Sequence, residues 1–83
     1  MSPRTAARMD FFQKPIIVFA TRAIKGRIKV RFRKLQQLVP EAKVEFVDVS
    51  RSEKTPVIYH KGDVISGGRI EQFLLYAQSL AGE

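Results

Sequence analysis

The chain has 83 residues, of which 45% are hydrophobic and 28% are charged, and its formal net charge is +7. This length suffices for one compact domain rather than two, and the apolar share argues against a disordered chain. The absence of cysteine excludes disulfides, thiolate catalysis and cysteine-bound metal clusters. The longest apolar runs fall far short of the roughly 20 residues that a membrane-spanning helix needs, so we expect no membrane span.

Residues 1–14 are expected to form an N-terminal arm that precedes one domain over residues 15–83. The arm shows no strong hydrophobic periodicity, and it carries two arginines before its first acidic residue, Asp10. This composition fits a mitochondrial targeting segment and an ordinary flexible arm equally well. The bulky apolar residues of the arm are Met9, Phe11 and Phe12. Such side chains are seldom left bare in water, so they are predicted to pack on the domain itself or on a neighbouring chain.

The first predicted strand runs from Pro15 to Ala20. This segment is β-branched and almost wholly apolar, which is typical of a central strand covered on both faces. The following segment, residues 24–39, is ambiguous, because residues 27–33 alternate strictly between basic and apolar types as in a strand with one basic face.

A helix competes with that strand over residues 24–39. On a helix, one face gathers the apolar residues Ile24, Ile28, Phe32, Leu35, Leu38 and Val39. We favour the helix, ended by Pro40, because proline disfavours the α conformation in the residue before it. The helix places Val30 outward and Arg31 beside the apolar stripe, where its aliphatic stem would follow the edge of the core.

Residues 43–49 alternate well enough to predict a second strand, followed by a polar turn over residues 50–54. A helix between two strands of one sheet implies a right-handed crossover and parallel pairing. Short strands are then predicted at residues 56–60 and 64–66, joined as a hairpin because Gly62 supplies the positive φ that such turns need. Apolar residues at helical spacing over residues 70–80 predict a last helix.

The positive charge is concentrated in one segment that contains no acid. Its basic residues are Arg22, Lys25, Arg27, Lys29, Arg31, Arg33 and Lys34. The other eight basic residues of the chain are balanced by eight acidic residues. This distribution indicates an acidic partner such as RNA, an anionic lipid surface or a negative protein face. The plainer alternative is a solvated helix face that only aids solubility.

A threonine–proline pair, a strand, a glycine turn and a Gly-Gly pair follow one another in the chain. They are Thr55-Pro56-Val57-Ile58-Tyr59, Lys61-Gly62 and Val64-Ile65-Ser66-Gly67-Gly68. This order resembles a segment of the glutaredoxins, in which the proline is cis. The resemblance implies a thioredoxin-like (glutaredoxin-like) α/β fold of order β-α-β-β-β-α with a four-stranded mixed sheet. The vestigial glutathione-site positions that it implies are Thr55, Pro56, Gly67 and Gly68.

The first half of the chain departs from the glutaredoxin pattern. Glutaredoxins open their first helix with a Cys-x-x-Cys or Cys-x-x-Ser motif, and this chain reads Ile24-Lys25-Gly26-Arg27 there. Neither isoleucine nor arginine can attack sulfur, so thiol–disulfide exchange is lost. The loop after Val49 is also too short for the helix that glutaredoxins insert before their cis-proline. This trimmed form is similar to the small thioredoxin-fold accessory subunit of respiratory complex I and to related mitochondrial ribosomal proteins.

Other candidate sites have simpler interpretations. The single histidine, His60, lacks the partners that a metal site needs and is predicted to lie on the surface, so no metal site is expected. Asp48 and Glu45 lie an odd number of residues apart on one strand, so they face opposite sides and cannot form a catalytic pair. The Gly-Gly pair before the last helix can offer N–H groups to an anion, although tight packing at the turn is the interpretation that we favour.

These observations predict a non-catalytic accessory subunit of a larger assembly, either a respiratory complex or a mitochondrial ribosome. It would dock through the basic helix, the N-terminal arm and an exposed sheet edge. The alternatives are a protein that binds the RNA backbone and a redox-inactive protein that binds glutathione. No cofactor is expected, the expected partners are other protein subunits with RNA as a second candidate, and the expected location is mitochondrial or else cytoplasmic.

Overall fold

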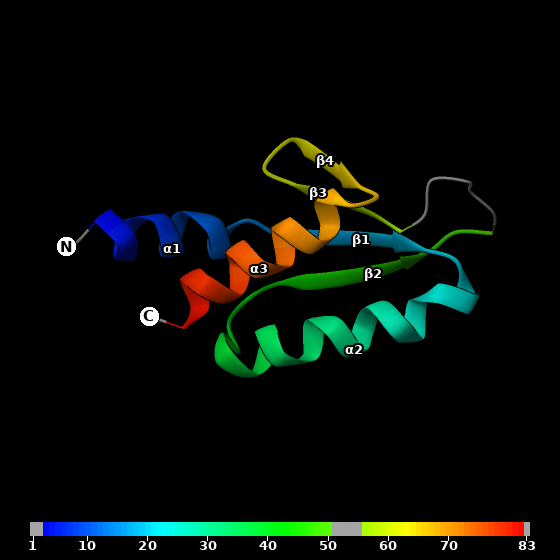
Figure 1. The fold of residues 1–83 in the computed structure, drawn as a ribbon, viewed down its shortest axis with the longest axis horizontal. Helices are drawn as coiled ribbons and strands as arrows, with labels where there is room; N and C mark the ends of the chain where they lie inside the picture. Colours follow the sequence, from blue (N-terminus) through cyan, green and yellow to red (C-terminus); the bar gives the residue numbers. More distant parts are fainter. Residues whose placement is uncertain (1–2, 51–55, 83) are drawn as a thin grey trace.

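The structure is a computed structural model that describes residues 3–50 and 56–82. In chain order, its elements are α1 (Pro3–Gln13), β1 (Ile16–Ala20), α2 (Arg22–Leu38), β2 (Val44–Asp48), β3 (Val57–His60), β4 (Asp63–Ser66) and α3 (Arg69–Ala81) (Figure 1). None of these helices is both long enough and apolar enough to cross a membrane. The predicted α/β class with a four-stranded mixed sheet is confirmed.

The four strands pair in the order β2-β1-β3-β4. β1 and β2 are parallel, as the crossover through a helix predicts, whereas β1 and β3, and β3 and β4, are antiparallel. The turn between β3 and β4 places Lys61 at φ 53° and Gly62 at φ 80°. Two successive residues with positive φ form the turn that matches the twist of a two-residue hairpin, so the predicted hairpin is confirmed.

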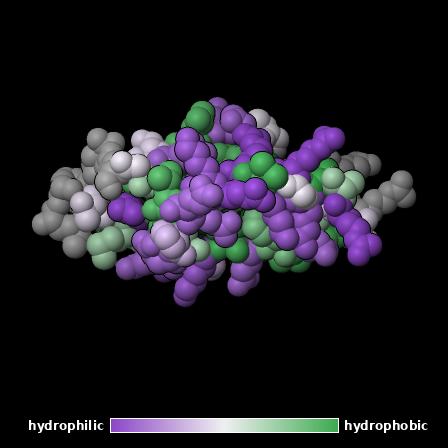
Figure 2. All heavy atoms as spheres, turned by 90° about the horizontal axis from the view of Figure 1, so that it is seen from below, coloured by the Kyte–Doolittle hydropathy of each residue, from purple (hydrophilic) through white to green (hydrophobic). Residues whose placement is uncertain are grey.

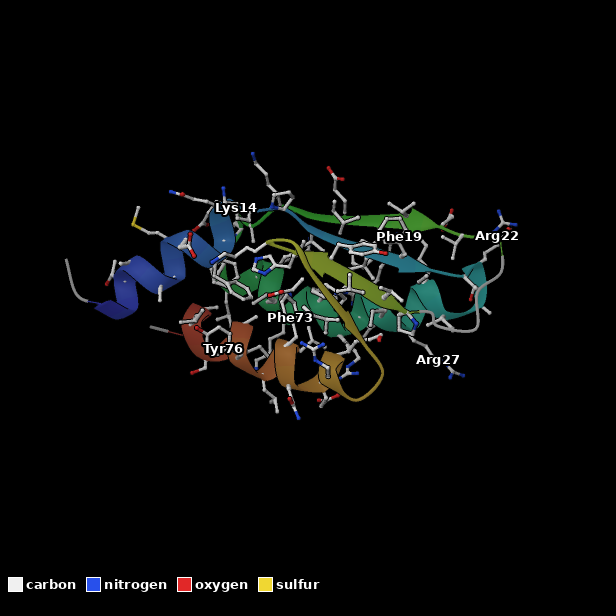
Figure 3. The ribbon with its side chains drawn as sticks, turned by 90° about the horizontal axis from the view of Figure 1, so that it is seen from above. Lys14, Phe19, Arg22, Arg27, Phe73 and Tyr76 are labelled. Carbon is white, nitrogen blue, oxygen red and sulfur yellow. The ribbon has the colours of Figure 1, made fainter. Side chains whose placement is uncertain are left out.

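Two of the helices, α2 and α3, lie on the same side of the sheet (Figure 3). The core-facing residues of α2 are Ile28, Phe32 and Leu35. Phe32 is fully buried and meets the ring of Phe46 on β2 edge to face, with 5.8 Å between the ring centroids. The helical interpretation of the basic segment is therefore confirmed, and the basic strand is wrong. The last helix is confirmed as α3.

The N-terminal arm differs from the expectation because residues 3–13 are helical. Phe11 and Phe12 at the end of α1 are both buried in the core of the domain. The ring of Phe11 lies 5.4 Å from that of Phe73 on α3, and α1 runs beside the C-terminal half of α3 (Figure 1). Of the two predicted places for these aromatic residues, their own domain or a neighbouring chain, the structure shows the first, whereas Met9 is exposed.

Candidate functional site

The sheet has an open face on the side away from α2 and α3. The side chains that alternate onto it are Ile17, Phe19, Glu45, Val47, Val57, Tyr59, Val64 and Ser66. Strand register aligns these residues in two rows that cross all four strands. Figure 3 shows Phe19 on the side of the sheet away from Phe73 and α3. The open face is thus a continuous, mostly apolar surface with Glu45 and Ser66 at opposite margins.

The exposure of the open face contradicts the prediction that β1 is covered on both sides. Ile16 and Val18 are buried beneath the helices, but Tyr59 is 42% exposed and Val64 is 51% exposed. Phe19 is half-buried, and its ring stacks edge to face on Tyr59 with 5.0 Å between the centroids. The sequence of β1 carries the signal of two-sided burial, yet no described helix packs on this side.

The basic residues of α2 form two rows rather than one face. The row beside β2 contains Lys25, Lys29 and Arg33, each four residues after the last. Lys25 Nζ lies 2.9 Å from Asp48 Oδ1, and Lys29 Nζ lies 5.5 Å from the centre of the Phe46 ring. A hydrogen bond from Lys25, with the added charge of Arg22, holds the pKa of Asp48 below its usual range.

The second basic row faces α3 and contains Arg27, Arg31 and Lys34. Arg31 forms an ion pair with Glu71 on α3, which explains how a charged side chain tolerates its place beside the apolar stripe. Between the rows lies Val30, which is 60% exposed, as predicted. Figure 2, which looks onto α2, shows hydrophilic side chains over most of this face with apolar patches among them.

Lys25, Lys29 and Arg31 are thus engaged within the domain, and the charge of Arg22 acts on Asp48. Arg27, Arg33 and Lys34 form no ion pair with the residues that the structure describes. These three are available to an external acidic group. The plainer interpretation, a solvated face, is consistent with the exposure of these three side chains.

The positions that resemble a glutathione site are only partly described. Thr55 lies outside the described residues, whereas Pro56 is half-buried and directly precedes β3. Gly67 adopts φ 59°, and Gly68 is the N-cap of α3. A Cβ added at either glycine would meet no atom within 4 Å. Tight packing, the interpretation that the sequence favours, is therefore wrong, and the left-handed backbone of Gly67 is the physical reason for a glycine there.

The structure also places His60 differently from the prediction. His60 is only 5% exposed, and its Nε2 donates to the carbonyl oxygen of Phe11 at 2.8 Å. It lies in the wall of a cavity of about 450 Å³ between α1, the β3–β4 hairpin and α3. An ion pair between Asp10 and Lys61 spans the rim, and the hydrogen bond from Lys61 lowers the pKa of Asp10.

Sequence reasoning missed this cavity, although one signal for it exists. His60 is two residues after Ile58, so both side chains point to the same face of β3, and Ile58 is fully buried. The two acidic residues of β2 behave as predicted: Asp48 turns to α2, whereas Glu45 lies on the open face. Among the described residues, no three histidine or acidic side chains gather as a metal site would require.

Comparisons of the chain with family models, with curated proteins and with solved structures find no match.

Proposed function

We propose that the chain is a non-catalytic accessory subunit of a larger protein assembly. The observation that carries the proposal is the open face of the sheet. Parallel strands are normally buried on both sides, and the parallel pair of β1 and β2 forms one half of this face. A continuous apolar surface without a covering layer is typical of an interface with another protein.

A thioredoxin-like topology is part of the proposal. Its support is the strand order β2-β1-β3-β4 with a helix after β1 and a helix after β4, together with the glutaredoxin-like sequence around Pro56 and the Gly-Gly pair. The helix that glutaredoxins insert between the second and third strands has no room in this shorter chain. A partner would then supply a layer that the described residues do not form.

The proposal of a non-catalytic role rests on composition. The chain has no cysteine, so the thiol chemistry of the family that it resembles is not available. A mitochondrial location stays a prediction, supported by the resemblance and by the composition of residues 1–14. Phe11 and Phe12 are core residues, so removal of residues 1–14 would expose the core.

The test is purification of the tagged full chain from its native cells under mild conditions, with the partners identified by mass spectrometry. Val64→Lys places a charge on the open face, at its β4 side. Val30→Lys is the matched control, since Val30 is exposed to a similar degree, 60% against 51% for Val64, but lies on the outer surface of α2. We expect Val64→Lys to lose the co-purifying subunits and Val30→Lys to retain them, with both variants folded.

Two results would count against this function. One is a tagged chain that elutes alone as a stable monomer. The other is a set of partners that both lysine variants retain equally, because the open face would then not be the interface.

Binding to the RNA backbone is the second candidate, and the unpaired cations of α2 favour it. Neutralisation of phosphates would make the affinity fall steeply with salt. Titration of the chain with homopolymeric RNA at increasing salt checks this. No binding at low salt would exclude the RNA function without affecting the subunit proposal.

A further inference from the structure

β2 is an edge strand, and no strand among residues 3–50 and 56–82 pairs with its outer main-chain groups. Ile16 N donates to Lys43 O at 2.8 Å, and Val49 N donates to Ala20 O at 3.1 Å. Main-chain groups alternate in direction along a strand, so the odd-numbered residues of β2 face β1. The N–H and C=O groups of Val44, Phe46 and Asp48 therefore point outward from the edge.

The other edge of the sheet, β4, is less accessible to an added strand. Arg69 Nη1 donates to the carbonyl oxygen of Val64 at 3.3 Å, so one outward acceptor of β4 is already occupied. β4 also follows directly from a tight turn and has only four residues. Of the two edges, β2 is thus the better template for an additional strand.

The spacing of the basic row beside β2 matches the spacing of alternate residues along the strand. Lys25 reaches Asp48 and Lys29 reaches Phe46, so four residues along α2 correspond to two residues along β2. Four helical residues rise about 6.0 Å and two strand residues about 6.6 Å, so the spacings match. Continued by one step, the correspondence places Arg33 level with Val44. The row thus follows the three residues whose main-chain groups point outward, with Lys25 already paired with Asp48.

We propose that the β2 edge binds an extended acidic segment of a partner protein as a fifth strand. The main chain of the segment would pair with Val44, Phe46 and Asp48. Every second side chain would point to the α2 side, where carboxylates about 6.6 Å apart would meet Lys29 and Arg33. Neither of these cations has an ion pair with the described residues, whereas Lys25 is already paired with Asp48. The side chains between them would extend the open face, so apolar residues are expected there.

Charge decides between the occupants of this edge. A second copy of the chain would bring two basic rows together and would be repelled, whereas an acidic segment is attracted. The inference deepens the proposed function and rests on it, because it names the chemistry of the segment that docks. The edge and the open face are nevertheless separate surfaces, and variants can test them separately.

The probe is a fluorescent ten-residue peptide in which glutamate and valine alternate, and fluorescence anisotropy measures its binding to the purified full chain. Asp48→Pro removes an outward N–H and leaves the β1 ladder intact, since proline is tolerated on the free side of an edge strand. Asp48→Ala is its control, because both variants lose the same carboxylate. We expect Asp48→Pro to weaken binding at least about tenfold relative to Asp48→Ala. The proline removes one main-chain hydrogen bond to the peptide and disturbs the neighbouring ones.

A second pair of variants does not depend on proline. Arg33→Glu and Lys34→Glu make the same change in net charge, but Arg33 lies beside β2 and Lys34 lies on the side of α3. We expect Arg33→Glu to weaken binding about tenfold and Lys34→Glu to change it less than about twofold. Amide spectra of all variants check that they fold.

Equal binding by the two Asp48 variants, or equal weakening by the two glutamate variants, would overturn the proposed edge. A further contradicting result is that homopolymeric RNA displaces the peptide and binds the Asp48→Pro variant as well as the parent. The basic row would then be a phosphate site, and the proposed strand-binding edge would be wrong. If the peptide does not bind while Val64→Lys still releases the native partners, the edge proposal is wrong and the subunit proposal is retained. If the peptide binds as expected but no partners are found in cells, the subunit proposal falls instead.

Discussion

The two faces of the sheet carry similar residues but differ in burial. Along β1, Ile16 and Val18 are buried beneath the helices, whereas Ile17 and Phe19 alternate onto the open face and are only half-buried. On β3, His60 is buried and Tyr59, its neighbour in the chain, is exposed. Burial here follows from which face receives a helix rather than from the hydrophobicity of each residue. Residues on the two faces should therefore differ in how much they stabilise the fold.

The largest expected difference lies between two phenylalanines. Phe32 is fully buried under the sheet, so Phe32→Ala should cost about 3–5 kcal/mol of unfolding free energy. Phe19→Ala on the open face should cost about 1–2 kcal/mol, chiefly through the lost stacking on Tyr59. Urea unfolding measures both, with Phe32→Leu as a milder variant if Phe32→Ala does not fold. Equal losses for Phe32→Ala and Phe19→Ala would show that a covering layer exists on both faces.

The next comparison uses two adjacent residues on opposite faces. His60→Ala should cost about 2–4 kcal/mol, because it opens a cavity and leaves the carbonyl of Phe11 without its donor. Hydrogen exchange should then rise first in α1, which that bond ties to β3. Tyr59→Ala should cost about half as much or less and should leave α1 protected. A protected α1 in His60→Ala would mean that the aromatic contacts alone hold α1.

Smaller effects are expected at two exposed glycines that differ only in backbone conformation. A Cβ has open space at both Gly26, inside α2, and Gly62, in the hairpin turn at φ 80°. Gly26→Ala should stabilise the fold by about 0.5–1 kcal/mol, since alanine favours the helix. Gly62→Ala should destabilise it by about 1 kcal/mol, since alanine resists positive φ. Changes of the same sign in thermal unfolding would contradict this assignment.

The smallest expected effect concerns two ion pairs at the rims of the covered face, Asp10–Lys61 and Asp48–Lys25. Hydrogen bonds from the lysines lower the pKa of both carboxyls from 3.8. Their stabilisation is therefore present above the unfolded-state pKa and is lost as the pH falls through the folded-state pKa. Asp10→Asn and Asp48→Asn should each be slightly less stable than the parent near neutral pH.

The small deficit of the two asparagine variants should vanish in strong acid, where the parent carboxyls are protonated too. Urea unfolding at several pH values measures it, and Glu45→Asn on the open face serves as the control. A deficit that persists unchanged into strong acid would show that packing, rather than charge, links these residues.

Sequence reasoning recovered the elements whose signals are local. The helical spacing of α2 outweighed the strict alternation around Val30, because burial of Phe32 and Leu35 needs a period of 3.6. The short α1 lacked such a signal and was expected to be an arm, since its amphipathic character is weak and tertiary packing of Phe11 holds it. His60 was misplaced because a polar side chain near a turn usually lies on the surface, and its buried partner, Phe11, is far away in the sequence.

For the candidate site, the sequence predicted which residues are basic but not how they are arranged. The seven basic residues were identified, but a count of charges does not show that Lys25 and Arg31 are held by acids on β2 and α3. Their division into two rows depends on the rotation of α2 against its neighbours. The open face could not be predicted either, because the apolar residues of β1 read as buried on both sides.

By itself, the sequence determined the absence of thiol chemistry, the basic segment, the parallel crossover and the hairpin, because each depends on residue identity or on contacts close along the chain. Only the tertiary structure decided which sheet face is bare, which edge is free and which cations remain unpaired. Those properties arise where α2, α3 and the strands meet across long sequence separations, and no local pattern encodes which surface is left without a partner.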